Sequence, residues 1–498
     1  MLQTRECWDA TGGPPISTKW VDVNKGDQVN YDIRCRLVAR EMGGGKSDEF
    51  YAPTPPLEAK RLLFSQAATN RRLGAREKKL LFVDARKAYF NARVDKPTYV
   101  ELPPEIRSPG QCGRLQRCMY GTKRAATLWE QTYSRSLVRL GFIQGIASPC
   151  CFKHSTHDLQ LVVHGDDFTV LGCDADLDWF QKTIQKEFEV KIRGRLGSGS
   201  KDDKSMRILN RIIRWTNTGI KIEADPRHVE ILIKEMGLGE ANPVVTPGAK
   251  EREGRSEQAD QPLDRAEAGA YRACVARANY LAQDRCDIAY AVKEACREMA
   301  NPTTSSWDKV KRVVRYLKGE PRVIYEYKWQ NQENLCVYVD TDWAGCFKTR
   351  KSTSGGAIMR GSHLIKHWST TQQTIALSSG EAELKGIVKG ATEGIGLKSV
   401  GRDLDIDHSV SLYTDSSAAM GMVARKGIGR VRHIEVGELW IQDAVKRGVL
   451  SIHKVKGEYN PADILTKYVE KGKIHQHCHA MGLAPESGRP ESAPATTV

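Results

Sequence analysis

Three aspartates near the ends of apolar segments have the residue types and spacing of a metal site. The apolar run LLFV ends in Asp84, and Asp166 and Asp167 lie 82 residues further on, between two β-rich runs in LQLVVHGDDFTVLG. Gly165 with the two aspartates predicts the tight turn of a β-hairpin. Two Mg²⁺ ions about 4 Å apart need several oxygen ligands and leave positions open for phosphates. The set fits such a site, although a single Asp-Asp turn is more often a surface hairpin.

Four further acids follow a similar pattern in the C-terminal part of the sequence. They stand at the end of the strand-like run LCVYVD, early in a helix that begins at SSGEAEL, at the end of SLYTD, and at the start of the helix-like PADILTK: Asp340, Glu383, Asp415 and Asp463. Together they could converge on one pair of metal ions that cuts a phosphodiester with water. Singly, each acid is more often a helix cap or a solvated charge.

The elements that would position these acids form two β-containing regions joined by a helical one. From Trp20 to Val190 short β-rich runs alternate with one long helical segment, 124–140, in an α+β pattern. Residues 237–262, poor in apolar side chains, predict a linker. Helices are predicted at 267–283, 286–299 and 306–318, and a second β-rich region runs from Leu335 to about Val469. Residues 1–16 are expected to be a ragged start, and 471–498 a disordered tail.

The third predicted helix has one apolar face and a basic remainder. Ser305 with Asp308 forms a capping-box pattern, and Gly319 stands at the stop position. An i, i+3, i+4, i+7 stripe would pack: Val310, Val313, Val314 and Leu317. The other faces carry Lys309, Lys311, Arg312, Arg315 and Lys318. They predict either a solvated charged surface or a contact with a polyanion.

Charge and composition narrow the class of partner. Of 498 residues, 76 are Lys or Arg and 61 are Asp or Glu, which gives a formal net charge of +15. That excess predicts attraction to nucleic acid or to an anionic membrane surface. No secretory signal and no run of about 20 apolar residues is visible, so we expect an intracellular protein that does not span a membrane. The 13 scattered cysteines suit reduced thiols, and the HQHCH cluster at 475–479 is interpreted as solvated tail.

Six sequence blocks resemble the reverse transcriptase of copia-type Pol polyproteins. They are STKWVDV, RLVARE, LLFVDARKAYFNARV, LQRCMYGTKRAATLW, LGFIQGIASPCCF and VVHGDD, in the family's order and spacing. The likeness continues through YRACVARANYLAQDRCDIAYAV and RYLKG. It implies α+β polymerase fingers and palm at 17–195, then a helical thumb and connection at 196–333.

The resemblance also implies residue roles. Asp84, Asp166 and Asp167 would be the metal-binding carboxylates of the palm, with Asp167 in a supporting part. Tyr89 would lie beneath the deoxyribose and exclude a 2′-hydroxyl. Arg36 would contact the triphosphate through forked hydrogen bonds. Arg124 stands where the family has a nucleotide-contacting Gln, and His164-Gly165 where it has Tyr-Val.

Further runs resemble the RNase H domain that follows the polymerase in copia-type elements. They are DTDWAG, KTRKSTSGG, LSSGEAEL, YTDSSAA, RHIEV and PADILTK. The likeness implies an α/β RNase H-like domain at 334–470 with Asp340, Glu383, Asp415 and Asp463 as its catalytic and metal-binding set. Asp342 and Glu381, each two residues away from a member of that set, remain alternatives.

The implied function is RNA-directed DNA synthesis with RNA cleavage in the hybrid, by two-metal-ion catalysis with Mg²⁺, or Mn²⁺ in its place. The implied partners are an RNA template, a primer, dNTPs and an RNA–DNA hybrid, in a cytoplasmic particle or the nucleus. Two alternatives remain: a viral-type RNA-dependent RNA polymerase, against which Tyr89 and the second domain argue, and a decayed copy that binds nucleic acid without catalysis. The sequence leaves the oligomeric state open.

Overall fold

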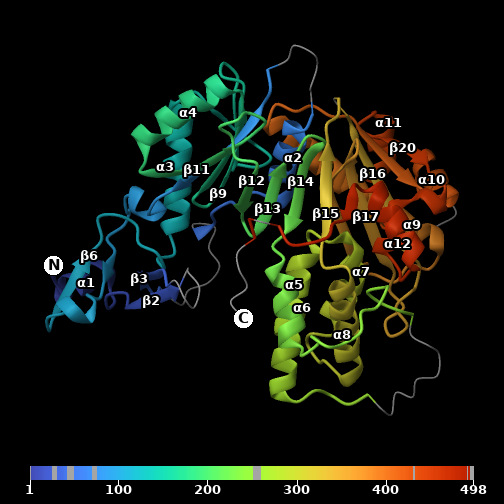
Figure 1. The fold of residues 1–498 in the computed structure, drawn as a ribbon, viewed down its shortest axis with the longest axis horizontal. Helices are drawn as coiled ribbons and strands as arrows, with labels where there is room; N and C mark the ends of the chain where they lie inside the picture. The colour runs from blue at the N-terminus through green and yellow to red at the C-terminus, as the bar shows by residue number, and fades with distance from the viewer. Residues whose placement is uncertain are drawn as a thin grey trace.

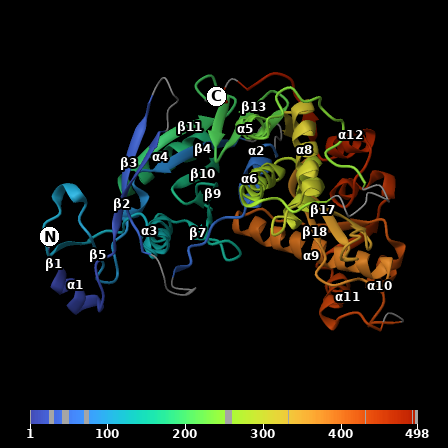
Figure 2. The same cartoon turned by 90° about the horizontal axis from the view of Figure 1, so that it is seen from below.

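The computed structural model describes residues 2–24, 31–41, 50–69, 76–250, 260–331, 333–429, 432–490 and 492–493. Figure 1 shows small N-terminal elements at one end of the molecule, sheets through its middle, and the last sheet with its helices at the other end. A helical bundle projects from the middle sheets. Figure 2 shows the same elements from below, with helix α2 (Leu57–Ala67) near the middle of the molecule. No helix among the described residues is both long and apolar enough to span a membrane.

The N-terminal elements form a small unit. β1 (Leu2–Gln3), β6 (Gln111–Arg114) and β5 (Tyr99–Val100) make a three-stranded sheet, and η3 (Pro104–Ile106) lies between β5 and β6 in the chain. α1 (Thr4–Thr11) buries Cys7 against Tyr99 and Cys112. The ragged start predicted for 1–16 is therefore wrong for these residues, because a capping box between Gln3 and Glu6 and a small apolar core hold the helix. A two-stranded ribbon follows, β2 (Thr18–Asn24) with β3 (Ile33–Ala39).

An antiparallel six-stranded sheet carries the first set of acids. Its strands, in order, are β11 (Val190–Leu196), β4 (Lys79–Ala85), β10 (Asp167–Gly172), β9 (Leu159–His164), β8 (Cys151–His154) and β7 (Ile143–Gln144). One face packs on α3 (Ala125–Arg139) and α4 (Asp174–Glu187) through alternate residues such as Val83 and Phe168. The opposite face, with Phe82 and Leu171, packs on α2 (Leu57–Ala67). Apolar side chains on both faces explain why these strands are continuous hydrophobic runs in the sequence. The short helix η2 (Ala88–Asn91) follows β4.

Helix α2 connects the six-stranded sheet to the rest of the molecule. Residues 59–67 are all buried, polar ones included. The guanidinium of Arg61 donates to the Asp284 carboxylate at 3.0 Å and to the Ile365 carbonyl at 3.2 Å. Arg360 donates to Gln66 at 2.6 Å, and its other terminal nitrogen donates to Ser65 at 3.0 Å. A single apolar core therefore runs from the six-stranded sheet through α2 to the C-terminal sheet that contains Leu335 and Val337.

A second sheet joins the middle of the chain to its C-terminus. Its strands, in order, are β12 (Ser205–Ile208), β13 (Arg211–Trp215), β14 (Gly219–Ala224), β15 (Val323–Lys328) and β21 (Leu483–Pro485). α12 (Lys471–Ala480) precedes β21 and contains HQHCH, of which His477 and Cys478 are buried. The predicted disordered tail is therefore wrong for 471–485, because Ile474, Cys478 and Leu483 join the main core. Residues 491 and 494–498 lie outside the described residues.

Four helices form the bundle that projects from this sheet. They are α5 (Arg227–Glu235), α6 (Arg265–Ala282), α7 (Cys286–Arg297) and α8 (Thr304–Gly319), so the three predicted helices are confirmed. The valines and the leucine of the α8 stripe are buried in the bundle core. The predicted cap of α8 is wrong: Thr303, not Ser305, is the N-cap, and it forms the capping box with Ser306.

The basic face of α8 is engaged by the chain itself. Arg312 donates to the Thr246 hydroxyl at 2.8 Å, Arg315 donates to the Asn242 carbonyl at 2.6 Å, and Lys318 donates to the Ala241 carbonyl at 2.9 Å. Lys309 pairs with Glu298 at 2.9 Å. Three of these cations therefore contact the described part of the predicted linker, whose residues 251–259 lie outside the described residues. The polyanion contact of this face stays a prediction.

The last sheet combines antiparallel and parallel strands. Its order is β18 (His363–Thr371), β17 (Thr353–Arg360), β16 (Leu335–Asp342), β19 (Val410–Thr414) and β20 (Ser451–Lys454), with β16, β19 and β20 parallel. The long helix α9 (Ser379–Asp403) packs across β16. The remaining elements are α10 (Ser417–Ala424), η5 (Val436–Glu438), α11 (Trp440–Lys446), η6 (Gly457–Tyr459) and η7 (Pro461–Leu465).

Candidate active sites

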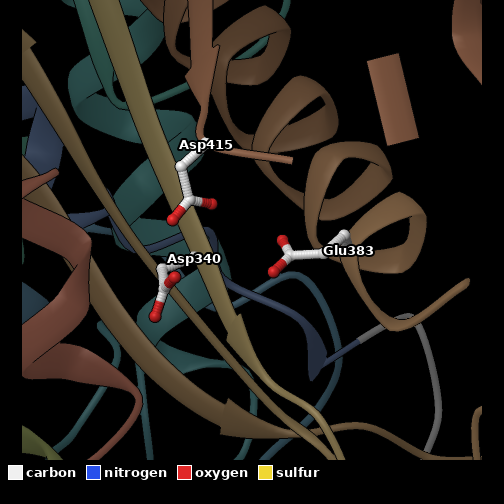
Figure 3. Close-up of side chains that lie close together, drawn as sticks. All are labelled: Asp340, Glu383 and Asp415. Atoms are coloured by element: carbon white, nitrogen blue, oxygen red, sulfur yellow. The ribbon is translucent and has the colours of Figure 1, made fainter. Parts of the chain in front are cut away.

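Three acids from distant parts of the sequence meet beside the last sheet. Asp340 lies on β16, Asp415 follows β19 directly, and Glu383 lies in the second turn of α9. One carboxylate oxygen from each lies within 4.8 Å of the other two, and Figure 3 shows the three carboxylates pointing toward one another. Among the described residues this is the one set of three or more acidic, His or Cys ligands that meets that spacing. We call it the C-terminal carboxylate trio.

Strand register and helix packing bring the trio together. The parallel pairing of β16 and β19 ends at Tyr338 opposite Tyr413, so Asp340 and Asp415 both lie two residues beyond that pair. Glycines 386, 390 and 394 line the face of α9 against β16; a Cβ at Gly390 would lie 2.4 Å from a methyl of Val339. The close approach brings Glu383, which lies three residues before Gly386 and so on the same helix face, to the end of the strand.

Burial and mutual repulsion raise the pKa values of two members. Desolvation, followed by the charges of Asp340 and Asp415, raises the pKa of Glu383 to about 9. Desolvation also raises the pKa of Asp340 to about 6. Oε2 of Glu383 is buried and has no hydrogen-bond partner. A buried carboxylate oxygen without a partner, facing two more carboxylates, fits hard divalent cations such as Mg²⁺ or Mn²⁺, which prefer oxygen ligands.

The two alternatives raised by the sequence lie outside the trio. Glu381 serves the start of α9: it accepts from the Leu377 backbone amide at 2.8 Å and pairs with Lys385 at 2.8 Å. Asp342, the last residue of β16, has its carboxylate against Gly345, where a Cβ would lie 1.7 Å from its Oδ2. The fourth predicted acid, Asp463, lies in η7 beside the trio and pairs with Lys467.

The first set of acids lies at one end of the six-stranded sheet. Asp84 on β4 is directly opposite Asp167 on β10, and Gly165 and Asp166 form the turn between β9 and β10 as predicted. Gly165 has φ +65°, a conformation that favours glycine. Its carbonyl accepts from the indole of Trp129 at 2.9 Å, and the Asp166 carbonyl accepts from the Ala85 amide at 2.8 Å. These bonds fix the hairpin tip beside the end of β4.

Charges around the hairpin differ from those of the trio. Desolvation first, then Asp167 and Asp84, raise the pKa of Asp166, whereas Arg36 lowers it. Asp167 pairs with Arg193 at 3.4 Å. Lys60 on α2 is 3% exposed, and its ammonium has no hydrogen-bond partner. Within the described chain, the oxygens of Asp84, Asp166 and Asp167 do not form a set within 4.8 Å of one another. The two aspartates on paired strands and the one in the turn still share one end of the sheet.

Two of the three predicted nucleotide contacts lie near this hairpin. Tyr89, in η2, and Arg36, on β3, both contact Tyr120: the Tyr89 and Tyr120 ring centroids are 4.6 Å apart, and the Arg36 guanidinium lies 5.6 Å from the Tyr120 centroid. The charge of Asp166 raises the pKa of both tyrosines, after desolvation. Arg124 instead pairs with Asp95, to which its Nε donates at 3.1 Å, and the nucleotide contact of Arg124 stays a prediction.

Tyr120 is the residue that the sequence analysis missed. A signal was present next to it, because Gly121 has φ +89° and a Cβ there would lie 1.9 Å from the Ala39 carbonyl oxygen. Only a glycine allows that approach of the segment to the end of β3, and the approach brings Tyr120 to Arg36.

Comparison of the sequence with known proteins identifies the family of this chain. The model of the reverse transcriptase (RNA-dependent DNA polymerase) family matches residues 9–250. The retrovirus-related Pol polyprotein from transposon TNT 1-94 of Nicotiana tabacum is 26% identical over 95% of this chain, and that from transposon RE2 of Arabidopsis thaliana is 26% identical over 96%. The chain belongs to the copia-type Pol polyprotein family.

The matches cover 36% and 33% of those two relatives, so this Pol chain spans about a third of their length. The first set of acids lies inside the reverse transcriptase match. The C-terminal carboxylate trio lies beyond that match but within the region that aligns with the transposon relatives. Among solved structures, a foamy viral protease-reverse transcriptase in complex with RNA/DNA hybrid is similar over 89% of this Pol chain and 50% of that chain, with a TM-score of 0.48 and 10% identity.

Proposed function

We propose that this Pol chain is an RNA-directed DNA polymerase with an attached RNase H, and that it copies transposon RNA into DNA. Membership of the reverse transcriptase family supports the polymerase part. The buried, unpartnered oxygen of Glu383, facing Asp340 and Asp415, is the observation that carries the RNase H part. The fingers and palm would occupy 17–195, the thumb and connection 196–333, and the RNase H-like domain 334–470.

In the polymerase site, Asp84 and Asp166 would hold the divalent cations, and Asp167 would support them. When bound, the cations would neutralise the triphosphate and the developing charge of the transition state. Tyr89 would lie beneath the sugar and exclude a 2′-hydroxyl, and Tyr120 would hold the Tyr89 ring in place. Arg36, whose guanidinium lies over the same Tyr120 ring, would neutralise phosphate charge on the incoming dNTP.

In the RNase H site, the C-terminal carboxylate trio with Asp463 would hold a second pair of cations. These cations, when bound, would activate a water and stabilise the leaving oxygen. Asp340 and Asp415 would be held at fixed separation by the parallel strands, and Glu383 by the glycine face of α9. The partners would be an RNA template, a primer and their hybrid, and the basic excess of the chain favours contacts to the phosphates.

A primer-extension assay on a homopolymer RNA template with Mg²⁺ tests the polymerase part. The wild-type protein should extend the primer, whereas Asp166→Asn should stop synthesis, with a loss of about 2–4 kcal/mol of transition-state stabilisation. Asp158→Asn is the matched control, because Asp158 lies between β8 and β9 of the same sheet and pairs only with Lys78 in the contacts described. Normal extension by a folded Asp166→Asn protein would remove Asp166 from the site.

A nucleic-acid-binding protein without polymerase activity is the second candidate. It is favoured by the separation of the Asp84, Asp166 and Asp167 oxygens and by the pairing of Asp167 with Arg193. The same assay separates the two. Wild-type protein that binds template–primer but extends no primer with either Mg²⁺ or Mn²⁺ would support the second candidate.

A further inference from the structure

Lys467 lies between two of the proposed RNase H carboxylates. Its ammonium forms a short ion pair with Oδ1 of Asp463 and lies 3.9 Å from Oδ2 of Asp340. Its charge also acts on Asp342 and on Glu383. The positive charge of Lys467 thus acts on four acids, Asp340, Asp342, Glu383 and Asp463. Without it, the negative charges of neighbouring acids would repel one another.

The residues on either side of Lys467 are anchored. The Thr466 hydroxyl donates to Oδ2 of Asp340 and lies 3.1 Å from the Asp463 carbonyl. The Tyr468 ring packs edge-on against Tyr290 with centroids 4.8 Å apart, and a Cβ at Gly248 would lie 1.9 Å from the same ring. The backbone at Lys467 is therefore held on both sides.

The side chain of Lys467 is less confined than its backbone. It is 39% exposed, whereas the side chains of Asp340 and Asp463 are 7% and 11% exposed. A long, flexible side chain at the rim of a buried acidic site can leave toward solvent without any change in the backbone. The carboxylates that it contacts cannot leave in the same way, because strand β16 and η7 hold them.

We propose that Lys467 is a positioning residue that occupies the cation position between Asp463 and Asp340 in the metal-free protein and competes with a divalent cation for it. The ammonium neutralises the acids and keeps Asp463 beside Asp340 until a cation binds. A cation that takes both carboxylates displaces the ammonium toward solvent. This inference rests on the proposed RNase H site. It implies that the charge of Lys467 lowers the affinity of that site for a divalent cation.

Binding of Mn²⁺ without nucleic acid, followed by electron paramagnetic resonance, tests the competition. The full chain is used with Asp166→Asn in every sample, so that the polymerase site contributes little. Lys467→Gln should lower the Kd for Mn²⁺ roughly fivefold, the size expected when a partly exposed ion pair no longer has to be broken. Lys467→Arg, which keeps the charge, should retain the wild-type Kd. Lys385→Gln, which removes a lysine from Glu381 instead, is the matched control and should also leave the Kd unchanged.

Thermal unfolding provides a readout that a merely structural lysine would not reproduce. In EDTA, Lys467→Gln should unfold at a lower temperature than wild type, because the acids lose their neutralising charge. In saturating Mg²⁺ the difference in unfolding temperature should disappear, since the bound cation then neutralises the acids in place of Lys467. The competition is overturned if Lys467→Gln still unfolds at a lower temperature than wild type in saturating Mg²⁺. It is also overturned if the Kd of Lys467→Gln for Mn²⁺ is unchanged or higher.

The two proposals fail in distinguishable ways. If Lys467→Gln tightens Mn²⁺ binding but the wild-type chain cuts no RNA in a hybrid, the competition stands and the RNase H proposal falls. If the wild-type chain cuts RNA and the Mn²⁺ Kd does not respond to Lys467→Gln, the RNase H proposal stands and the competition falls.

Discussion

The ring of Tyr89 lies against the ring of Tyr120, with centroids 4.6 Å apart and planes inclined at 48°. Tyr89 follows the strand that carries Asp84, whereas Tyr120 precedes the helix α3. Tyr120 also contacts Arg36 from the β2–β3 ribbon. Tyr120 therefore connects the proposed sugar-excluding residue to the proposed triphosphate-binding residue.

Nucleotide selection should depend on both rings. Tyr89→Ala should raise the ratio of rNTP to dNTP incorporation, because the bulk proposed to exclude a 2′-hydroxyl is gone. Tyr120→Leu should raise the same ratio by a smaller factor, roughly fivefold, since an aromatic pair contributes about 0.5–1.5 kcal/mol beyond its burial. Tyr120→Phe keeps the ring and should behave as wild type. An unchanged ratio in Tyr89→Ala would make Tyr89 an ordinary packing residue.

The two proposed activities should be separable by single substitutions. Asp415→Asn should stop cleavage of RNA in a hybrid and leave primer extension largely intact, because Asp415 belongs to the C-terminal carboxylate trio and not to the hairpin. Conversely, Asp166→Asn should retain RNA cleavage. Gel assays of both activities on one labelled hybrid give the answer, with Asp443→Asn on the exposed surface of α11 as the control. Unaffected cleavage by Asp415→Asn would assign the trio a structural role.

The pKa of Glu383 predicts how the stability of the metal-free protein depends on pH. Its pKa is raised from 4.5 to about 9 in the folded state. Between those values the folded protein binds more protons than the unfolded chain, so the free energy of unfolding falls as pH rises through that window. Urea unfolding in EDTA should therefore show lower stability at pH 8 than at pH 6.

Two comparisons isolate the contribution of Glu383. Saturating Mg²⁺ should reduce the loss of stability at pH 8, because a bound cation stabilises the ionised carboxylates. Glu383→Gln should flatten the pH dependence in EDTA, since it removes the titrating group. Equal pH slopes for wild type and Glu383→Gln would contradict the raised pKa.

The buried side chain of Arg360 should matter for the stability of the whole chain. Its terminal nitrogens donate to Ser65, Gln66 and Thr69 of the α2 segment, and burial lowers its pKa to about 10. Arg360→Met should cost about 2–4 kcal/mol of unfolding free energy, because it leaves buried acceptors unpaired. Arg402→Met, at an exposed site on α9, should cost little.

The same unfolding curves test whether the regions unfold together. One apolar core includes α2, the six-stranded sheet and the last sheet. We therefore expect the residues on both sides of α2 to unfold in a single transition. Two separate transitions, with Arg360→Met shifting neither, would show that the α2 contacts do not couple the regions.

Several features of the candidate sites could be predicted from the sequence because they depend on local patterns. Apolar runs that end in Asp84 and Asp340 are strands, and Gly165-Asp166 is the turn between two more. The 3.6-residue spacing of Val310, Val313 and Leu317 predicted the buried face of α8. The position of Glu383 on the glycine face of α9 was also present in the sequence, three residues before Gly386, but its meaning depended on knowing which face packs.

The sequence by itself determined the family, the strand-end acids and three of the four helices of the bundle, since those rest on residues close together along the chain. Only the tertiary structure decided that Glu383 rather than Glu381 joins Asp340 and Asp415, that Tyr120 joins Tyr89, and that Arg124 is paired with Asp95. It also decided that α12 and β21 are ordered, and that the basic face of α8 binds the linker. Each of these outcomes depends on which distant segment fills the space beside a residue, and burial and hydrogen bonding across such contacts are not encoded in local periodicity.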